Sequence, residues 1–302
     1  MSDSPNVFNR RVVRLHRDRA AAGLKNHDYL FAEVGERLAD RLDDIKRRFP
    51  LALDLGCHGG ELARLVAGRG GIETLVQCDL SPRMARRAGS HCLAADEEFL
   101  PFPAACFDLV LSSLSLHWVN DLPGALAQIR LTLKPDGLFL AAMLGGDTCK
   151  ELRIALTAAE IAEEGGLSPR LSPFADAGDL GALLQRAGFA LPVVDQEAIK
   201  VSYGDPWKLM ADLRGMGESN AVAERRRGFT RRATLMAAAS HYRELFGDAE
   251  GRVPATFQVI YMTAWAPDPS QPRPLEPGSA KTSLAEALGA AETPSEEKTK
   301  PA

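Results

Sequence analysis

Three aspartates, Asp54, Asp79 and Asp96, each come directly after a short apolar run of the kind that forms a buried strand. The carboxyl ends of parallel strands lie at one edge of a sheet, and ligands of such sheets bind outside that edge. Carboxylate oxygens accept hydrogen bonds, so Asp79 suits the hydroxyls of a ribose, Asp96 an exocyclic amine and Asp54 an ammonium group. The three carboxylates therefore predict a site for a cationic ligand that contains a ribose and an adenine.

A glycine-rich turn with the sequence GCHGG, at residues 56–60, follows Asp54 and leads into a helical run at residues 61–67. Such a turn lets backbone N–H groups approach a nucleotide-like ligand closely. It lacks the Gly-Lys-Ser/Thr ending of a phosphate loop, does not fit G-x-G-x-x-G and contains no Arg or Lys, which favours a cofactor without phosphates. The candidate cofactor-binding residues are Asp54, Gly56, Cys57, His58, Gly60, Asp79, Leu80, Asp96, Glu97 and Ser113.

The elements that would carry these residues alternate between strands and helices. Strands are expected at residues 51–55, 75–78, 91–95, 107–112 and 138–143, with late strands at 191–194, 198–203 and 255–265. Helices are expected at residues 27–49, 61–67, 122–133, 150–163, 180–187, 207–216 and 231–246. This alternation predicts an α/β protein with a mainly parallel, Rossmann-like sheet and helices on both faces.

The composition is that of an ordinary globular protein, with 45% apolar and 25% charged residues among 302. The net charge of −4 gives no reason to expect a nucleic-acid partner. No apolar run reaches the roughly 20 residues of a membrane span, although peripheral contact with an inner membrane stays open. The five cysteines are odd in number and none forms C-x-x-C, which argues against structural zinc and a disulfide framework. The start lacks a secretory signal, and we expect a bacterial cytoplasmic location.

Changes in composition divide the chain into three parts. Residues 1–25 form a basic arm, residues 26–265 the α/β domain, and residues 266–302 a proline-rich tail that we expect to be disordered. The domain is expected to have a cofactor half, residues 26–145, and a helical cap or substrate half, residues 146–265. The arm contains His16-Arg17-Asp18, formally an H-x-D iron motif, but no second histidine is evident, so we predict no metal site. Its arginine-rich face is expected to be solvated. The oligomeric state is left open.

The glycine turn and the later acidic segments resemble the motifs of class I S-adenosylmethionine-dependent methyltransferases. Residues 54–60, DLGCHGG, are similar to the pattern D-x-G-x-G-x-G, and residues 79–84, 95–102 and 107–112 match later motifs. The resemblance implies a seven-stranded, mostly parallel sheet and S-adenosyl-L-methionine as the cofactor. One departure is His58, which stands at the middle glycine and would crowd the methionine end of that cofactor.

Longer segments narrow the resemblance to the complex I assembly factor 5 family, the methyltransferase-like arginine hydroxylases. They are residues 8–10, 49–54, 116–124, 145–148, 164–166, 168–169, 172–174, 215–220 and 253–258, and the likeness spans residues 7–266. It implies hydroxylation of an arginine in the iron–sulphur subunit of respiratory complex I. Two alternatives remain: methyl transfer to a carboxylate or small molecule, as in malonyl-carrier-protein O-methyltransferases, and a non-catalytic assembly chaperone.

Within that resemblance, three residues are candidates for catalysis. His117 would act as a general base and Trp118 would flank a cationic or apolar substrate. Glu218, together with Asp147, would bind a substrate guanidinium in a bidentate pair. The sequence contains no recognisable motif for the iron or flavin that hydroxylation normally requires.

Overall fold

The computed structural model describes residues 6–272, 279 and 282–289. The chain forms two compact units, residues 1–267 and residues 268–302. In the second unit the described residues include one short helix, α10 (Leu284–Leu288). The disorder expected for the tail falls largely on residues 273–278, 280–281 and 290–302, which lie outside the described residues.

The first unit is built on a seven-stranded sheet with the order β3-β2-β1-β4-β5-β7-β6. The strands are β1 (Leu51–Leu55), β2 (Thr74–Asp79), β3 (Cys92–Ala94), β4 (Phe107–Ser113), β5 (Leu133–Leu144), β6 (Ala190–Tyr203) and β7 (Val253–Trp265). Strands β1 to β5 pair in parallel, and β7 is antiparallel to both β5 and β6. The strand order reverses between β1 and β4, where ligands of open α/β sheets bind. The predicted α/β class with a mainly parallel sheet is confirmed.

Nine helices of the first unit are described, on the two faces of the sheet and beyond its end. They are α1 (Arg10–Ala20), α2 (Tyr29–Asp43), α3 (Glu61–Leu65), α4 (Pro82–Ala88), α5 (Leu122–Thr132), α6 (Lys150–Glu164), α7 (Ala177–Arg186), α8 (Pro206–Met216) and α9 (Arg232–Phe246). Two single 3₁₀ turns, Leu24–Asn26 and Leu116–Trp118, complete the set within that unit's described part. None of the described helices is long and apolar enough to cross a membrane.

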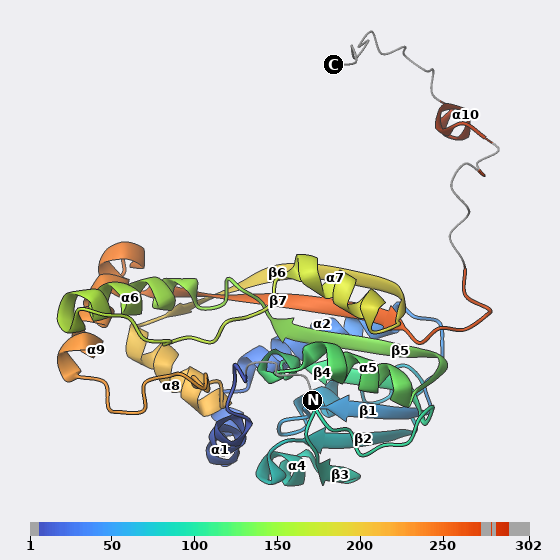
Figure 1. Ribbon diagram of the computed structural model, residues 1–302, viewed down its shortest axis with the longest axis horizontal. Coiled ribbons are helices and arrows are strands. Elements are labelled where there is room, and N and C mark those ends of the chain that lie inside the picture. Colours follow the sequence, from blue (N-terminus) through green and yellow to red (C-terminus); the bar gives the residue numbers. More distant parts are fainter. Residues whose placement is uncertain (1–5, 273–278, 280–281, 290–302) are drawn as a thin grey trace. The chain divides into compact units, whose positions relative to one another are not determined.

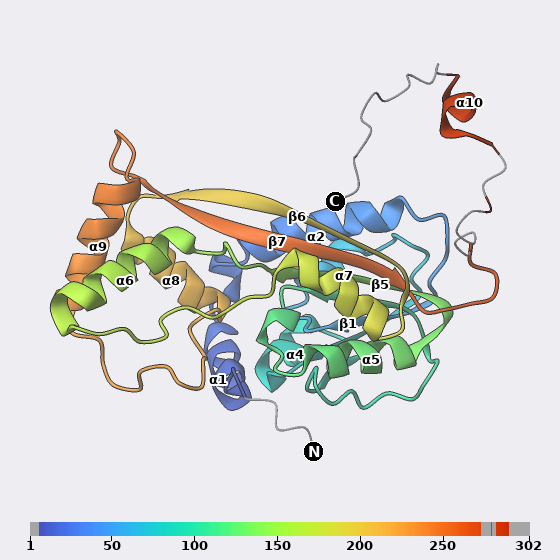
Figure 2. The ribbon, with the colours of Figure 1, turned by 45° about the horizontal axis from the view of Figure 1, so that its top comes forward.

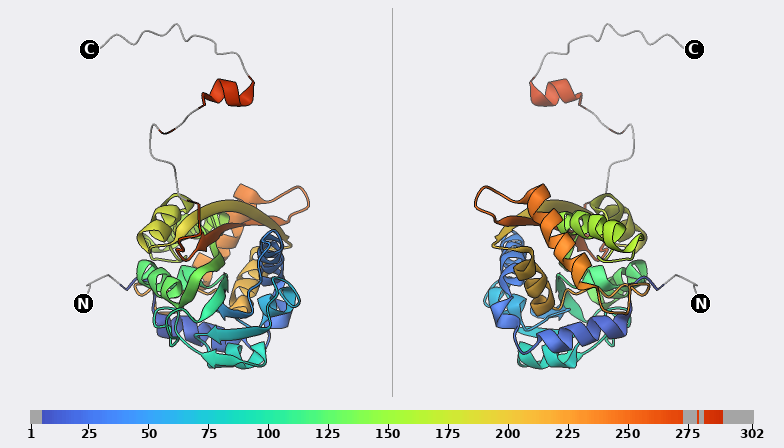
Figure 3. Two further views of the ribbon diagram at one scale, coloured as in Figure 1. Left: turned by 90° about the vertical axis from the view of Figure 1, so that its right-hand side faces the viewer. Right: turned by 90° about the vertical axis from the view of Figure 1, so that its left-hand side faces the viewer.

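The hydrophobic core lies in two layers because the central strands bury both of their faces. On one face Leu38 and Leu42 of α2 pack against the sheet, and on the other Leu126 of α5 and Leu184 of α7 do so. Figure 3 shows helices on both sides of the sheet, with α2 in blue and α5 in green. Alternate residues of each strand serve the two layers, which is why these strands read as nearly continuous apolar runs.

The late strands differ from the prediction. Residues 191–194 and 198–203 belong to one strand, β6, because Asp195, Gln196 and Glu197 continue the ladder against β7 instead of forming a turn. These polar residues are compatible with a strand because β6 is at the edge of the sheet, where side chains can face water. Strands β6 and β7 extend past the other strands and reach α6 and α9, which pack against each other (Figure 2). The carboxyl ends of β1, β2 and β5 point toward α1 and α8 (Figure 1).

Candidate functional site

The glycine turn holds its shape through backbone conformations that side chains rarely adopt. Gly56 has φ of 74° and Gly60, which precedes α3, has φ of 80°. The N–H groups of Gly56 and Cys57 donate to the carbonyl oxygen of Cys78 at 2.8 and 2.9 Å, which fastens the turn to β2. A Cβ at Gly56 would lie 2.1 Å from Oγ of Ser115, so no larger residue fits. The thiol of Cys57 is buried, and burial raises its pKa.

His58 lies across the turn and fills the space beside it. Its backbone is left-handed, with φ of 48°. Its Nε2 lies 3.1 Å from the carbonyl oxygen of Ser113 and 3.2 Å from that of Leu114, and its ring centroid lies 4.4 Å from that of Phe31. Burial, and then the charge of Arg17, lower the pKa of His58, so the ring is neutral and Nε2–H donates. The expected crowding of the methionine end of the cofactor by His58 stays a prediction.

Asp54 is the one predicted cofactor residue whose carboxylate is fully buried with neither oxygen hydrogen-bonded to any described residue. Burial raises its pKa to about 8, with smaller contributions from the carboxylates of Glu61 and Asp79. Oγ of Ser113, also buried, likewise has no partner in the described structure. Two unpartnered polar groups at the end of β1 and β4 can receive a hydrogen-bonding or cationic ligand.

Asp79 and Glu97 are fully buried and hold a guanidinium of the basic arm. Nη1 of Arg17 lies 3.2 Å from Oδ2 of Asp79 and 3.1 Å from Oε1 of Glu97, and Nη2 lies 2.9 Å from Oγ of Ser115. Asp79 also accepts from the backbone N–H of His58 at 3.1 Å and from that of Ser81 at 2.7 Å. Every carboxylate oxygen of Asp79 is thus engaged within the protein.

A second arm residue, Arg10, pairs with Asp96 at 2.6 Å and with the other carboxylate oxygen of Glu97. Burial acts to raise the pKa of Glu97, but the guanidinium groups of Arg10 and Arg17 outweigh it and bring that pKa to about 2. The side chain of Asp96 is 26% exposed and forms an ion pair with Arg10 of the arm. Leu80, the neighbour of Asp79, packs with the arm's apolar residues.

The expectation of a solvated arginine-rich face on the arm is wrong for these two residues. Arg17 is only 1% exposed, because Arg10, Val13, Arg17 and Ala20 follow one another at helical spacing and face the carboxyl edge of the sheet together. Sequence reasoning therefore missed Arg10, Arg17 and Ser115. The apolar residues Val13 and Ala20 between and after the arginines were the available signal that this face is buried.

The other part of the arm motif joins two neighbouring loops. His16 has Nδ1 3.1 Å from the carbonyl oxygen of Ser219, and Asp18 accepts from the hydroxyl of Ser81 at 2.6 Å. Across the described residues there is no group of three or more His, Cys, Asp and Glu side chains that could hold a metal ion.

With the arm in this position, the described residues leave too little space beside Asp54 for the methionine end of S-adenosyl-L-methionine. The cavity around Asp54, Cys57 and His58 has about 10 Å³, room for about one water molecule. Pockets for ligands of this size have a volume of about 300 Å³ or more. The carboxylate expected to bind the ribose, Asp79, is engaged by Arg17. Cofactor binding therefore requires a different position of α1.

The three candidate catalytic residues lie together. Nε2 of His117 and Nε1 of Trp118 each lie 3.0 Å from the same oxygen, Oε2 of Glu218. The side chain of His117 is fully buried and that of Glu218 is 6% exposed. Burial acts to raise the pKa of Glu218, but the positive field and hydrogen bond of His117 bring it below its usual range. The cluster is a carboxylate held in one orientation by two ring N–H groups. Nδ1 of His117 has no partner among the described residues, and the role of this residue as a general base stays a prediction.

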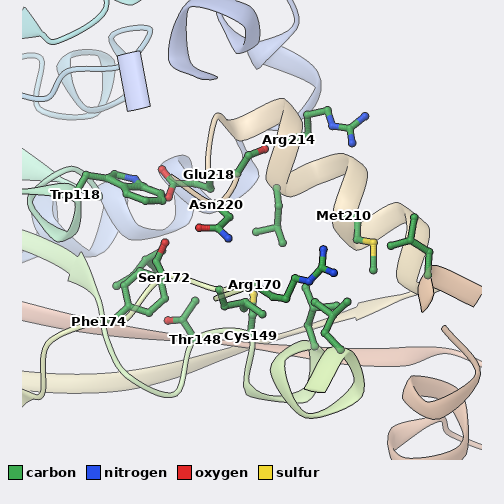
Figure 4. Close-up of a pocket in the computed structure, with 17 residues that line it drawn as sticks. Trp118, Thr148, Cys149, Arg170, Ser172, Phe174, Met210, Arg214, Glu218 and Asn220 are labelled. Carbon is green, nitrogen blue, oxygen red and sulfur yellow. Dashed lines mark hydrogen bonds between the residues drawn. The ribbon is translucent and has the colours of Figure 1, made fainter. Parts of the chain in front are cut away.

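Glu218 and Trp118 line a cavity of about 280 Å³ between the sheet edge and the helices α6 and α8. Figure 4 shows Trp118 and Glu218 side by side at one end of this cavity and Met210 at the other. Much of the wall is apolar, with Leu144, Leu152, Leu156, Leu171, Phe174 and Leu213. The expected pairing of Glu218 with Asp147 is wrong: Asp147 does not line the cavity, its side chain is 62% exposed, and it pairs with Lys150.

The chain is similar to known proteins over most of its length. A profile of a methyltransferase domain matches residues 53–141. Two relatives named arginine-hydroxylase NDUFAF5, mitochondrial, are 47% identical in Danio rerio, covering 93% of this chain and 89% of the relative, and 49% identical in Homo sapiens, covering 93% and 83%. A malonyl-[acyl-carrier protein] O-methyltransferase of a Methylovorus species is 34% identical, covering 88% of this chain and 92% of the relative.

Solved structures show the same fold at low identity. The YcgJ protein of Bacillus subtilis has a TM-score of 0.53 at 15% identity, covering 76% of this chain and 98% of that one. Phosphoethanolamine N-methyltransferase 2 of Haemonchus contortus, solved in complex with S-adenosyl-L-methionine, has a TM-score of 0.52 at 16% identity and covers 85% of this chain and 60% of that one. These likenesses show the fold of the chain, and the profile match places a methyltransferase domain over strands β1 to β5.

The cytoplasmic location expected from the sequence is contradicted, because the arginine-hydroxylase relatives are mitochondrial proteins by name. A basic segment interrupted by acidic residues, such as residues 7–22, does not discriminate between compartments. The stretch matched to these relatives covers 93% of the chain. It therefore includes the cofactor edge, defined as the carboxyl ends of β1, β2 and β4 with Asp54, Asp79 and Glu97, and also the Glu218 cavity. The chain belongs to the arginine-hydroxylase NDUFAF5 family, within the class I methyltransferase superfamily.

Proposed function

We propose that this chain hydroxylates an arginine side chain of a protein substrate, the iron–sulphur subunit of respiratory complex I, and so acts in the assembly of that complex. Family membership supports the reaction, since the relatives are named arginine-hydroxylases. The observation that carries the proposal is the cavity of about 280 Å³ with a buried carboxylate at one end. An arginine has an aliphatic stem and a planar cation at its tip, and the cavity offers a matching surface to each.

In this proposal Glu218 binds the substrate guanidinium. Both hydrogen bonds from His117 and Trp118 reach Oε2, which leaves Oε1 to accept from the substrate. His117 and Trp118 are positioning residues, since they hold the carboxylate in a fixed orientation. Leu152, Leu156 and the other apolar residues of the wall surround the substrate's methylene groups and exclude water.

The division of labour in the fold follows from this assignment. Residues 26–145 carry the cofactor edge, and residues 146–265 supply most of the cavity wall. Insertion of one oxygen atom into a C–H bond consumes dioxygen and two electrons, and the second oxygen atom leaves as water. The residues assigned here bind and orient the guanidinium. Dioxygen is the oxidant, and an external two-electron reductant together with two protons reduces its second oxygen atom to water.

A second candidate is methyl transfer to a carboxylate, favoured by the 34% identity to a malonyl-carrier-protein O-methyltransferase. Glu218 would repel a carboxylate substrate at its own end of the cavity, whereas Arg170 and Arg214 line other parts of the wall, so methyl transfer to a carboxylate is disfavoured at the Glu218 end alone. The non-catalytic chaperone is the third reading, in which the cofactor edge serves a structural purpose.

Co-expression of the chain with the iron–sulphur subunit, in a host without a relative of this chain, separates the three readings by mass spectrometry. Hydroxylation adds about 16 Da to one arginine of the subunit, and methylation adds about 14 Da. We expect the first result, its loss with Glu218→Gln, and its retention with Glu224→Gln, which removes the same charge at an exposed position six residues away. A subunit of unchanged mass that still requires the chain for assembly would support the chaperone and refute the proposal.

A further inference from the structure

A guanidinium of the chain, that of Arg17, is buried at the cofactor edge. The guanidinium of Arg17 is buried against two carboxylates, those of Asp79 and Glu97, and against the hydroxyl of Ser115. Burial acts to lower the pKa of Arg17, and the two carboxylates reverse this and raise it, so the group is permanently charged. A buried charge is tolerated only when it is paired, and the pairing here is mutual between arm and sheet.

The groups that hold Arg17 are the groups on which the cofactor site depends. Asp79 lies at the end of β2, where a carboxylate accepts from ribose hydroxyls in this class of fold. Its two oxygens already accept from Arg17 and from two backbone N–H groups. The cavity of about 10 Å³ beside Asp54 leaves little space for the methionine end of the cofactor. Arg17 itself occupies Oδ2 of Asp79 and the space beside it, where the ribose of a bound cofactor would lie.

We propose that α1 is a displaceable plug and that Arg17 and S-adenosyl-L-methionine occupy the Asp79–Glu97 site alternately. The exchange replaces hydrogen bonds at the edge and exposes the carboxylates of Asp79, Asp96 and Glu97 that Arg10 and Arg17 pair while the arm is docked. Ribose and adenine N–H and O–H groups replace those of Arg17, and the cationic methionine end faces Asp54, whose two oxygens have no partner among the described residues while the arm is docked. The proposal concerns cofactor loading and holds whichever reaction follows.

Displacement of α1 also acts on the loop that carries Glu218. His16 contacts the carbonyl oxygen of Ser219, and the N–H of Asn9 donates to the carbonyl oxygen of Ala221 at 2.8 Å. The ring of Phe8 packs edge-on against Trp118, with centroids 5.3 Å apart. The arm therefore joins the cofactor edge to the substrate cavity, and its release loosens the wall at Glu218 when the cofactor enters.

The first test uses the unmodified full chain and no substrate. Arg11, Arg14 and Arg19 are exposed residues of α1 and offer trypsin a cleavage site once the helix leaves the sheet. We expect saturating S-adenosyl-L-methionine to accelerate cleavage within residues 10–20 and at Arg225–Arg227, which follow the loop that the arm holds, and to leave cleavage elsewhere unchanged. Protection of the arm by the cofactor, or an unchanged cleavage rate with the cofactor bound, would overturn the proposal.

The second test measures cofactor affinity by calorimetry for Arg17→Met, Arg17→Lys and Arg14→Met. If the docked arm leaves about a tenth of the molecules able to bind the cofactor, the apparent Kd is about tenfold higher than the intrinsic Kd. Arg17→Met frees the site and should lower the apparent Kd by up to about tenfold. Arg17→Lys keeps a positive charge beside the carboxylates of Asp79 and Glu97, so the fold is preserved. We expect this variant to lower the Kd less than Arg17→Met does. The matched control, Arg14→Met, changes an exposed arginine of the same helix and leaves the Kd within about twofold of wild type. Weaker or unchanged binding by both Arg17 variants would show that Arg17 is not a competitor.

Discussion

Replacing Asp54 with asparagine removes the one carboxylate of the site that is buried without a partner among the described residues. Burial raises its pKa to about 8, against 3.8 for the ordinary side chain. The folded protein then binds a proton that the unfolded chain has lost, so Asp54 stabilises the fold fully below pH 3.8 and this contribution is lost as the pH rises through 8. Each tenfold difference in acid constant corresponds to about 1.4 kcal/mol, which makes the whole effect about 6 kcal/mol.

The window from pH 6.5 to 8 isolates this group from its neighbours. Between these limits the two-state expression for one proton gives a loss of about 1.5 kcal/mol in the free energy of unfolding of the wild type. The lowered pKa of His58 acts mainly below pH 6.5, its ordinary value, where stability falls with falling pH; at pH 6.5 it amounts to about 0.4 kcal/mol, equal in wild type and Asp54→Asn. The raised pKa values of Cys57 and Cys78 act only as the ordinary thiol begins to ionise, near pH 9.

Urea unfolding followed by tryptophan fluorescence, without cofactor, measures the effect at several pH values in this window. We expect the free energy of unfolding of the wild type to fall by about 1.5 kcal/mol from pH 6.5 to 8, and that of Asp54→Asn not to fall. Asp44→Asn, which removes the same charge at an exposed position, should follow the wild-type curve. An equal decline in wild type and Asp54→Asn would refute the assignment of a raised pKa to Asp54.

Three further changes test the remaining contacts. Glu218→Ala leaves the ring N–H groups of His117 and Trp118 buried without an acceptor and should cost about 3 kcal/mol in urea unfolding, whereas Glu218→Gln, which can still accept, should cost much less. Gly56→Ala adds a methyl group 2.1 Å from Oγ of Ser115 at a positive φ and should lower stability by about 3 kcal/mol; a fully stable variant would contradict the turn geometry. Phe8→Ala removes a buried ring from Trp118 and should weaken arm docking by about 3 kcal/mol, seen as a red-shifted tryptophan emission and faster tryptic cleavage of α1, and unchanged emission would contradict the contact.

Much of the candidate site was predictable because it depends on local patterns. The apolar run before Asp54, the glycines after it and the acidic residue that closes β2 are all adjacent in sequence to the elements that position them. The meeting of His117 with Glu218 involves residues 101 positions apart, and only the resemblance to a family placed them in one site before the fold was known.

The sequence by itself determined the alternation of strands and helices, the edge at which Asp54 and Asp79 gather, and the family. Periodicity and turn chemistry act over a few residues, and they hold wherever the chain lies in space. Only the tertiary structure decided that Arg17 occupies that edge. An arginine on a charged helix is usually solvated, and its burial depends on carboxylates, those of Asp79 and Glu97, that are 62 and 80 positions away in the chain and reach it only when the sheet and the arm dock.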